Sequence, residues 1–195
     1  MTASFMLCCK KLRLFFLLLF FCSTTSVLAN PSSVSIDSAE LIAAENGAYL
    51  LNADFNLVLS PALEEIVNKG LSLNFLVEFQ LVSPRRFWFD DEIASLTSQI
   101  SLTYHALSRQ YLVNRDGYQL AFSSIQEAKN EIARIRNWLV LDESISLKKG
   151  KDYQARLRMR LDQSKLPKAL HADTLNSEDW NMASEYYRWT PVISQ

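Results

Sequence analysis

The sequence has few of the residue types on which thiol, metal and phosphate chemistry depend. Its 195 residues include three cysteines, two histidines and four glycines. The cysteines all lie within the first 22 residues, and His105 and His171 are 66 residues apart, with no HxH or HExxH spacing. Zinc ligands normally come in such spacings, so we expect no metal site. The sequence also lacks a GxSxG segment and a glycine-rich loop, and we expect no cofactor.

The first 29 residues contain the three parts of a secretory signal. Three basic residues between positions 10 and 13 precede an apolar run at 14–22, which is shorter than the about 20 residues that span a membrane. Val27 and Ala29 are small residues of the kind found before a cleavage site. We therefore predict a signal peptide over 1–29, cleaved after about Ala29, and a periplasmic mature protein. A membrane anchor formed by the uncleaved signal is the alternative.

Cleavage would leave a domain over residues 30–195 that contains no cysteine, so its stability in an oxidising compartment would come from its core alone. A chain of about 165 residues can bury roughly 70% of its surface within one domain. The loss of three positive charges would change the formal net charge from −1 to −4. This mild acidity gives no basic face for a nucleic acid, and we expect membrane contact only through the signal segment.

Alternation of apolar and polar residues predicts a mainly β domain. From Leu71 to Leu81 every second residue is apolar, which is the period of a strand with one buried face. An Asn-Gly turn at 45–48 and an Asp-Gly pair at Asp116 and Gly117 predict two hairpins. Further strands are expected over 34–43, 48–59, 96–107, 109–122, 138–141 and 152–161.

Two short helices are expected between these strands. Over 60–70 a serine, a proline and a final glycine occupy the positions that favour a helix cap, a first turn and a helix end. Over 124–137 the spacing of Ser124 and Glu127 fits a capping box, and an apolar stripe continues as far as Ile135.

About eight strands with short turns and two helices predict an antiparallel β-sandwich, with an immunoglobulin-like arrangement as one option. Helices and strands do not alternate regularly, which argues against a parallel nucleotide-binding sheet. From about Leu166 the periodicity weakens and aromatic residues become frequent. We expect this part to be an irregular arm with a short helix near 179–187.

Two groups of acidic residues are candidates for acid–base chemistry. Asp90 and Asp91 would have to meet Glu178 and Asp179 across a cleft, as the carboxyl pairs of a hydrolase do. Carboxylates adjacent in sequence usually point apart, so we prefer the interpretation that these are solvated loop acids.

Three arginines form a stripe on one face of a predicted strand. Arg156, Arg158 and Arg160 alternate with apolar residues, so their side chains are separated by about 6.8 Å. The stripe could bind an acidic partner or a phosphate group. It could instead pair with acids such as Glu78 on neighbouring strands, each exposed pair contributing about 0–1 kcal/mol. We favour the second interpretation.

The segment SPRRFWFDDE at 83–92 combines arginines, aromatics and acids. Pro84 is expected to end the strand before it, since proline cannot extend a strand ladder. We expect the three aromatics to cross from one sheet to the other with at least one face buried, and Arg85 or Arg86 to stack on a ring or pair with a following acid. If the cluster is exposed, Arg85, Arg86 and Trp88 would instead form a contact site.

Several motifs, in order, are similar to those of a known family. The segments FNLVLSPALEEIVNKGLSLNFLVEFQL, PRRFWFDDEIA, RIRNWLVLDES and SEDWNMASEYYRW resemble the exported proteobacterial domain-of-unknown-function family 4390. The resemblance covers nearly all of the mature chain and implies no activity, ligand or catalytic residue. Members of this family are often similar to gene neighbours of a sensor kinase of the nitrogen-regulation type, so the resemblance implies an expected role as a periplasmic accessory to a membrane sensor.

Two functions from different classes follow from these observations. The first is a noncatalytic periplasmic binding or adaptor domain for a membrane sensor kinase or another envelope protein, with Arg85, Arg86, Trp88 and the arginine stripe as contact surfaces. The second is a periplasmic hydrolase that uses the loop carboxylates. We favour the first because the sequence offers no activated nucleophile and no set of metal ligands. A scaffold that only stabilises an envelope complex is a third option.

Overall fold

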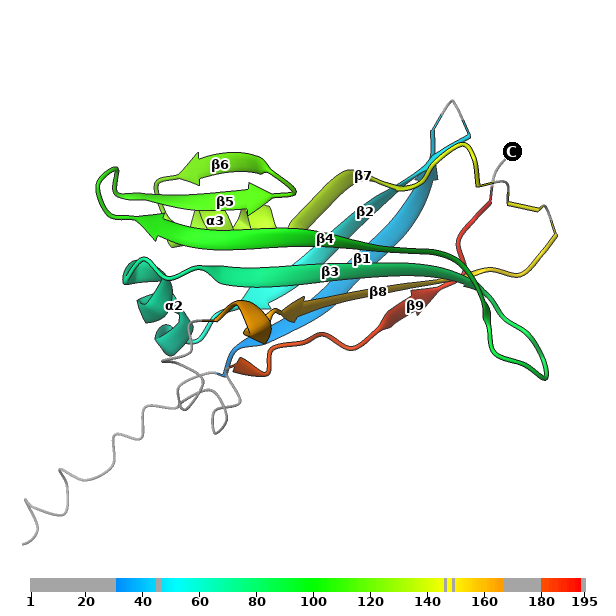
Figure 1. Ribbon diagram of the computed structural model, residues 1–195, viewed down its shortest axis with the longest axis horizontal. Helices are drawn as coiled ribbons and strands as arrows, with labels where there is room; N and C mark the ends of the chain where they lie inside the picture. The colour runs from blue at the N-terminus through cyan, green and yellow to red at the C-terminus, as the bar shows by residue number, and fades with distance from the viewer. Residues whose placement is uncertain (1–30, 45–46, 146, 149, 167–179, 194–195) are drawn as a thin grey trace, which may run out of the picture. The chain divides into compact units, whose positions relative to one another are not determined.

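The computed structural model describes residues 31–44, 47–145, 147–148, 150–166 and 180–193. The predicted signal segment, His171, Glu178 and Asp179 lie outside these residues. All described elements belong to the unit formed by residues 31–195. They form two antiparallel sheets, one of three strands in the order β1-β2-β7 and one of six in the order β6-β5-β4-β3-β8-β9 (Figure 1). The predicted fold class, mainly β with two short helices, is confirmed.

The order of the elements along the chain is as follows. They are β1 (Ser33–Ala43), β2 (Tyr49–Val58), α2 (Pro61–Asn68), β3 (Leu73–Ser83), β4 (Asp91–His105), β5 (Gln110–Arg115), β6 (Tyr118–Phe122), α3 (Ile125–Ile132), β7 (Arg134–Leu141), β8 (Gln154–Leu161), the 3-10 turn η1 (Gln163–Lys165) and β9 (Tyr187–Trp189).

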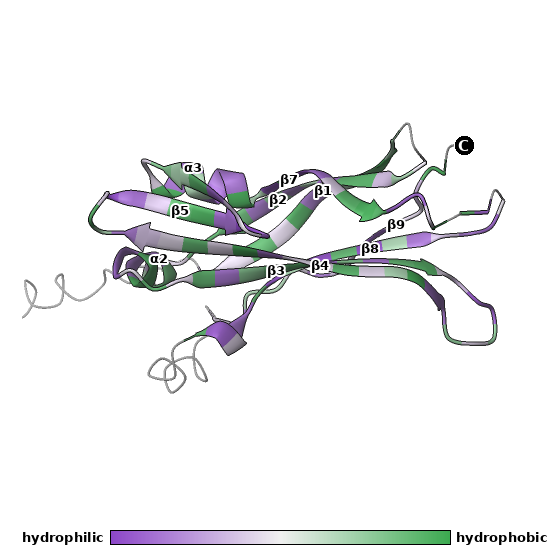
Figure 2. Cartoon of the chain, turned by 45° about the horizontal axis from the view of Figure 1, so that its top comes forward, coloured by the Kyte–Doolittle hydropathy of each residue, from purple (hydrophilic) through white to green (hydrophobic). Residues whose placement is uncertain are grey.

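Strand alternation builds one core from both sheets. Along β3 the odd-numbered residues Phe75, Val77 and Phe79 are buried, and along β2 Leu51 and Phe55 are buried in the same cluster. Figure 2 shows the corresponding alternation of hydrophobic and hydrophilic residues along the strands. The even-numbered side chains of β3 and β8 lie on the other face of the six-stranded sheet, because successive side chains of a strand point to opposite faces.

Both predicted hairpins are present. The β1–β2 hairpin pairs Ala43 with Tyr49, and the β5–β6 hairpin pairs Arg115 with Tyr118. Asp116 and Gly117, which connect β5 to β6, have φ angles of 48° and 93°. Two successive positive φ angles define the turn whose twist matches an antiparallel hairpin, and glycine adopts them at least cost.

The second helix is shorter than its apolar stripe predicts. Ser124 Oγ accepts a hydrogen bond from Glu127 N (3.2 Å), as expected of an N-cap, and the Glu127 carboxylate accepts hydrogen bonds from Ser123 N (3.2 Å) and Ser123 Oγ (2.9 Å). The helix ends at Ile132, and Ile135 is a buried residue of β7. The apolar stripe continues past the end of α3 because apolar residues of the helix and of the following strand β7 pack into the same core.

The C-terminal part forms a sheet edge where we had expected a helix. Between Asn181 and Ile193 no residue is helical, and β9 pairs with β8. Ser184 N donates to Met159 O and Leu161 N donates to Met182 O, both at 2.8 Å. The predicted helix near 179–187 is therefore wrong over the described residues, because these backbone groups satisfy the outer edge of β8 instead.

Candidate functional site

The arginine- and aromatic-rich segment is the loop of the β3–β4 hairpin. Pro84 directly follows the last residue of β3, as predicted, and β4 pairs back along β3 from Ser83↔Asp91 to Leu73↔Leu102. The loop extends from the end of these two strands at the lower right of Figure 1. The expected crossing between sheets is thus wrong, because the chain reverses within one sheet.

The three aromatic side chains of this loop are not packed against the core. Phe87, Trp88 and Phe89, here named the aromatic tip, have exposed fractions of 92%, 75% and 86%. Trp88 and Phe89 contact each other edge to face, with ring centroids 6.4 Å apart. The expectation that one face of the cluster is buried is therefore wrong. Apolar side chains rarely remain this exposed as a contiguous group unless the surface binds something.

The acids that follow the aromatic tip are held by cations. Asp90 Oδ2 lies 2.5 Å from Arg156 Nη2, and Asp91 Oδ2 lies 2.8 Å from Arg85 Nη2 and 3.8 Å from Lys151 Nζ. Each pair is partly exposed, so each contributes about 0–1 kcal/mol. The Asp90–Arg156 pair joins the base of the loop to β8, and the Asp91–Arg85 pair closes the loop across its own base. Asp90 and Asp91 thus have a structural use, whereas their proposed hydrolytic counterparts lie outside the described residues.

The arginine stripe, Arg156, Arg158 and Arg160, lies along β8 as the alternation predicts. Arg160 Nε donates to Glu78 Oε1 (2.8 Å), which confirms the expected pairing with that acid. Arg158 faces Glu78 directly in the strand register but forms no ion pair within the described part of the chain. Its Nε is also buried without a hydrogen-bond partner there. The stripe is thus neutralised at its two ends and not at its centre.

An aromatic ring and a fourth arginine extend this basic surface. The guanidinium of Arg158 lies 5.1 Å from the ring centroid of Tyr186, and that of Arg188 lies 5.6 Å from the same ring. Arg188 faces Arg156 across the β8–β9 pair. Two cations share one ring because a π face attracts each of them. Tyr186 and Arg188 were not predicted as site residues, since both belong to the arm that was expected to be irregular.

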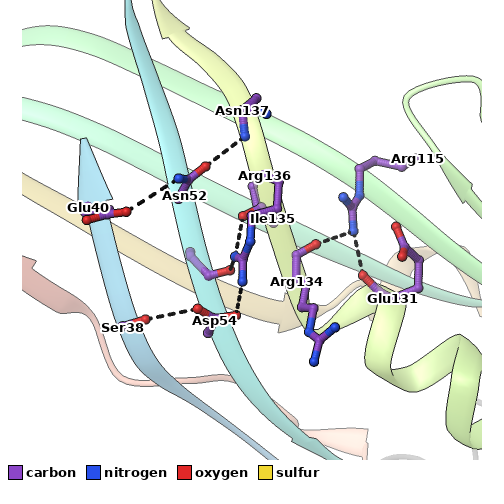
Figure 3. Close-up of polar contacts among 11 residues, drawn as sticks. Ser38, Glu40, Asn52, Asp54, Arg115, Glu131, Arg134, Ile135, Arg136 and Asn137 are labelled. Carbon is purple, nitrogen blue, oxygen red and sulfur yellow. Dashed lines mark hydrogen bonds and ion pairs between the residues drawn. The ribbon is translucent and has the colours of Figure 1, made fainter. Parts of the chain in front are cut away.

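A polar network closes an irregularity between β2 and β7. Arg136 Nη1 donates to Ala53 O (2.9 Å) and Arg136 Nη2 lies 2.5 Å from Asp54 Oδ1 (Figure 3). The hydrogen bond from Arg136 lowers the pKa of Asp54 below its ordinary value, and Ser38 Oγ adds a further hydrogen bond at 3.2 Å. The guanidinium takes the place of ladder hydrogen bonds where the strand register shifts, so the network has a structural role.

The same irregularity places Asn137 at an unusual φ of 53°. Its backbone N–H donates to Asn52 Oδ1 (2.9 Å), and Asn52 Nδ2 reaches Glu40 Oε1 at 3.5 Å (Figure 3). Asparagine is one of the few residues that tolerate this conformation. The bulge therefore has a complete local explanation.

The remaining features of the described residues concern metal binding and the membrane. His105 is exposed, with Nδ1 2.9 Å from Ser108 Oγ, and no group of three His, Cys, Asp or Glu residues there could hold a metal ion. In the same residues no helix is long and apolar enough to cross a membrane.

Comparison with known protein families finds a match over most of the chain. The family model described as Domain of unknown function (DUF4390) matches residues 31–190. No curated protein and no solved structure matches the chain. The matched range runs from before β1 to just after β9 and includes the aromatic tip and the arginine stripe.

Proposed function

The chain belongs to the DUF4390 family, and we propose that it is a noncatalytic binding or adaptor domain for a protein partner in the bacterial envelope. The aromatic tip and the arginine stripe form its contact surface. The proposal includes export to the periplasm by the signal segment 1–29, and a membrane sensor kinase or another envelope protein as the partner.

The exposure of the aromatic tip is the observation that carries this proposal. Trp, Tyr and Arg are the residues that most often dominate the energy of protein interfaces. Trp88 is such a residue, and Arg85 and Arg86 precede it by three and two positions. Packing does not explain the three rings, because most of their surface is accessible to water. A partner that encloses the tip would bury that surface.

The arginine stripe indicates the charge of the partner. The ion pair of Arg156 with Asp90 joins the start of the stripe to the base of the loop. From Arg156 to Arg160 the stripe extends about 14 Å along β8. Its centre, Arg158, and the adjacent Arg188 form no ion pair with a carboxylate in the described residues. We therefore expect the partner to present an apolar recess for the tip and acidic groups beside it.

The experiment is in-cell crosslinking of the tagged full-length protein, followed by identification of the proteins that it holds. The test variant combines Trp88→Ser with Arg158→Gln. The matched control combines Leu107→Ser with Arg109→Gln in the β4–β5 turn, where Leu107 is 93% exposed. We expect an envelope protein to be captured by the parent and the control and lost from the test variant.

Two further measurements keep this experiment interpretable. Circular dichroism and melting curves of both variants should match those of the parent, because all four side chains are at least partly exposed. Cell fractionation should place the parent in the periplasm. Equal loss of the captured protein in both variants, or a cytoplasmic location of the processed chain, would refute the proposed function.

A further inference from the structure

The two sheets differ in width, and part of the wider sheet lacks a full covering layer. The six-stranded sheet continues through β5 to its edge strand β6, whereas the three-stranded sheet ends at β7. Helix α3 contacts β5, β6 and β7 and covers part of the overhang. On the inward face of β6, Phe122 packs against the core, whereas Tyr118 and Leu120 remain exposed.

A row of paired residues shows this change from core to surface. Leu102 pairs with Val113, and Val113 pairs with Leu120, so the three side chains lie on the same face. Their exposed fractions are 0%, 2% and 50%. Tyr118, two residues before Leu120 and on the same face, is 83% exposed. The core face therefore continues outward as an open apolar surface.

A cavity of about 370 Å³ occupies this position. Its apolar wall consists of Val113, Tyr118 and Leu120 from the six-stranded sheet and Ile135 and Trp138 from β7. The volume falls at the lower end of the about 300–1,000 Å³ that small-molecule sites have. An aromatic ring or a branched aliphatic group would fit between the walls.

Arg115 supplies the main cationic group of the cavity. Its Nη2 donates to Glu131 O and Arg134 O, both at 2.9 Å, which anchors the side chain at the end of α3 (Figure 3). Its Nε is buried and has no hydrogen-bond partner in the described residues. Burial lowers the pKa of Arg115, although the charges of Glu131 and Asp116 partly offset this effect. Neither acid comes within ion-pair distance, so the cation is only partly compensated.

Asp116, Glu131 and Arg136 also line the cavity, and Asp116 and Arg136 already have polar partners. Asp116 accepts hydrogen bonds from Ser98 Oγ (2.6 Å) and Gln99 N (3.0 Å). Arg136 is paired with Asp54. A ligand oxygen would therefore find its best donor in Arg115, and a carboxylate would gain more there than a neutral oxygen, because hydrogen bonds to charged groups are stronger.

We propose that this cavity binds a compact aromatic or branched apolar molecule that carries one carboxylate. The apolar group lies between Leu120 and Trp138, and the carboxylate faces Arg115. The site is separate from the aromatic tip and the arginine stripe, so the two proposals can fail independently.

The test compares three molecules of nearly equal shape: phenylbutyrate, which carries a carboxylate, the corresponding neutral amide, and the corresponding cationic amine, phenylbutylamine. Binding to the full-length protein is followed by NMR through the indole N–H signals, with Trp138 as the reporter and Trp88 as the internal reference. We expect a shift at Trp138 alone and an affinity for the carboxylate about tenfold higher than for the amide, with the amine weakest. No binding, equal affinities or preference for the amine would overturn the proposal.

Matched variants locate the binding. Leu120→Trp should fill the cavity and abolish the shift, whereas Leu139→Trp should not, because Leu139 is likewise 50% exposed but does not line the cavity. Arg115→Gln should remove the preference for the carboxylate over the amide. If that variant unfolds, Leu120→Glu provides the second test. A new carboxylate at the rim should weaken the binding of phenylbutyrate by charge repulsion and should not weaken the binding of the amine. An unchanged order of affinities would contradict the assignment.

Discussion

Replacing all three residues of the aromatic tip by serine should leave the stability of the domain nearly unchanged. Full burial of a large apolar side chain contributes about 1.5–3 kcal/mol. With 92%, 75% and 86% of Phe87, Trp88 and Phe89 exposed, the three together contribute about 0.7–1.4 kcal/mol. Buried aromatics at a sheet crossing would lose about 3–5 kcal/mol each on truncation. The expected loss in the free energy of unfolding is therefore much larger for buried aromatics than for an exposed tip, and the difference exceeds the error of the measurement.

The assay is urea unfolding followed by circular dichroism, with the free energy of unfolding and its denaturant dependence compared between variants. The positive control is Phe79→Ala in β3, whose side chain is 0% exposed and should cost about 3–5 kcal/mol. Loss of more than about 3 kcal/mol in the serine variant would refute the exposure of the tip. It would also remove the observation on which the proposed contact surface rests.

Three further predictions concern local features of the fold. Asp54→Asn should lower the free energy of unfolding at neutral pH, because the pKa of Asp54 is lowered in the folded state. The parent should lose the stabilisation by the ionised carboxylate below about pH 4, so the unfolding curves of parent and variant should converge in acid. Ser124→Ala should cost about 1 kcal/mol in urea unfolding, since it removes the N-cap of α3, and an unchanged midpoint would contradict that role. Gly117→Ala should cost about 1–2 kcal/mol, because an alanine at φ 93° is strained, whereas a neutral effect would show that the turn can change type.

Much of the fold could be predicted because strand alternation reports directly which side chains are buried. The odd-numbered residues from Leu73 to Leu81 are buried in β3, and the alternation of Arg156 to Arg160 with apolar residues places the stripe on the opposite face. The Asp-Gly pair at 116–117 identified its hairpin because few other residues adopt two positive φ angles.

The errors occurred where a residue's environment depends on chain segments distant in sequence. The aromatic tip was expected to be buried because its composition is apolar, but composition does not tell whether a loop crosses to the other sheet or returns along the same one. Ile135 was assigned to a helix because a helix face and a following strand present the same apolar residues. The edge β9 and the stacking of Arg158 on Tyr186 depend on pairing with β8, which no local pattern encodes.

The cavity beside β6 could not be predicted for a related reason. It arises from the difference in width between the two sheets, and the alternation of β6 looks like that of any half-buried strand. The exposed fractions of Tyr118 and Leu120 become informative only when their pairing with buried residues is known.

The most direct test of the contact surface is site-specific photocrosslinking in living cells, with the photoreactive amino acid placed at position 88 in the aromatic tip or at position 107 in the β4–β5 turn. We expect an adduct with one envelope protein from position 88 and none from position 107. The adduct should disappear when Arg158→Glu is added, because the tip and the arginine stripe would then no longer bind the same partner. Equal adducts from both positions, or an adduct from position 88 that is indifferent to Arg158→Glu, would contradict the account.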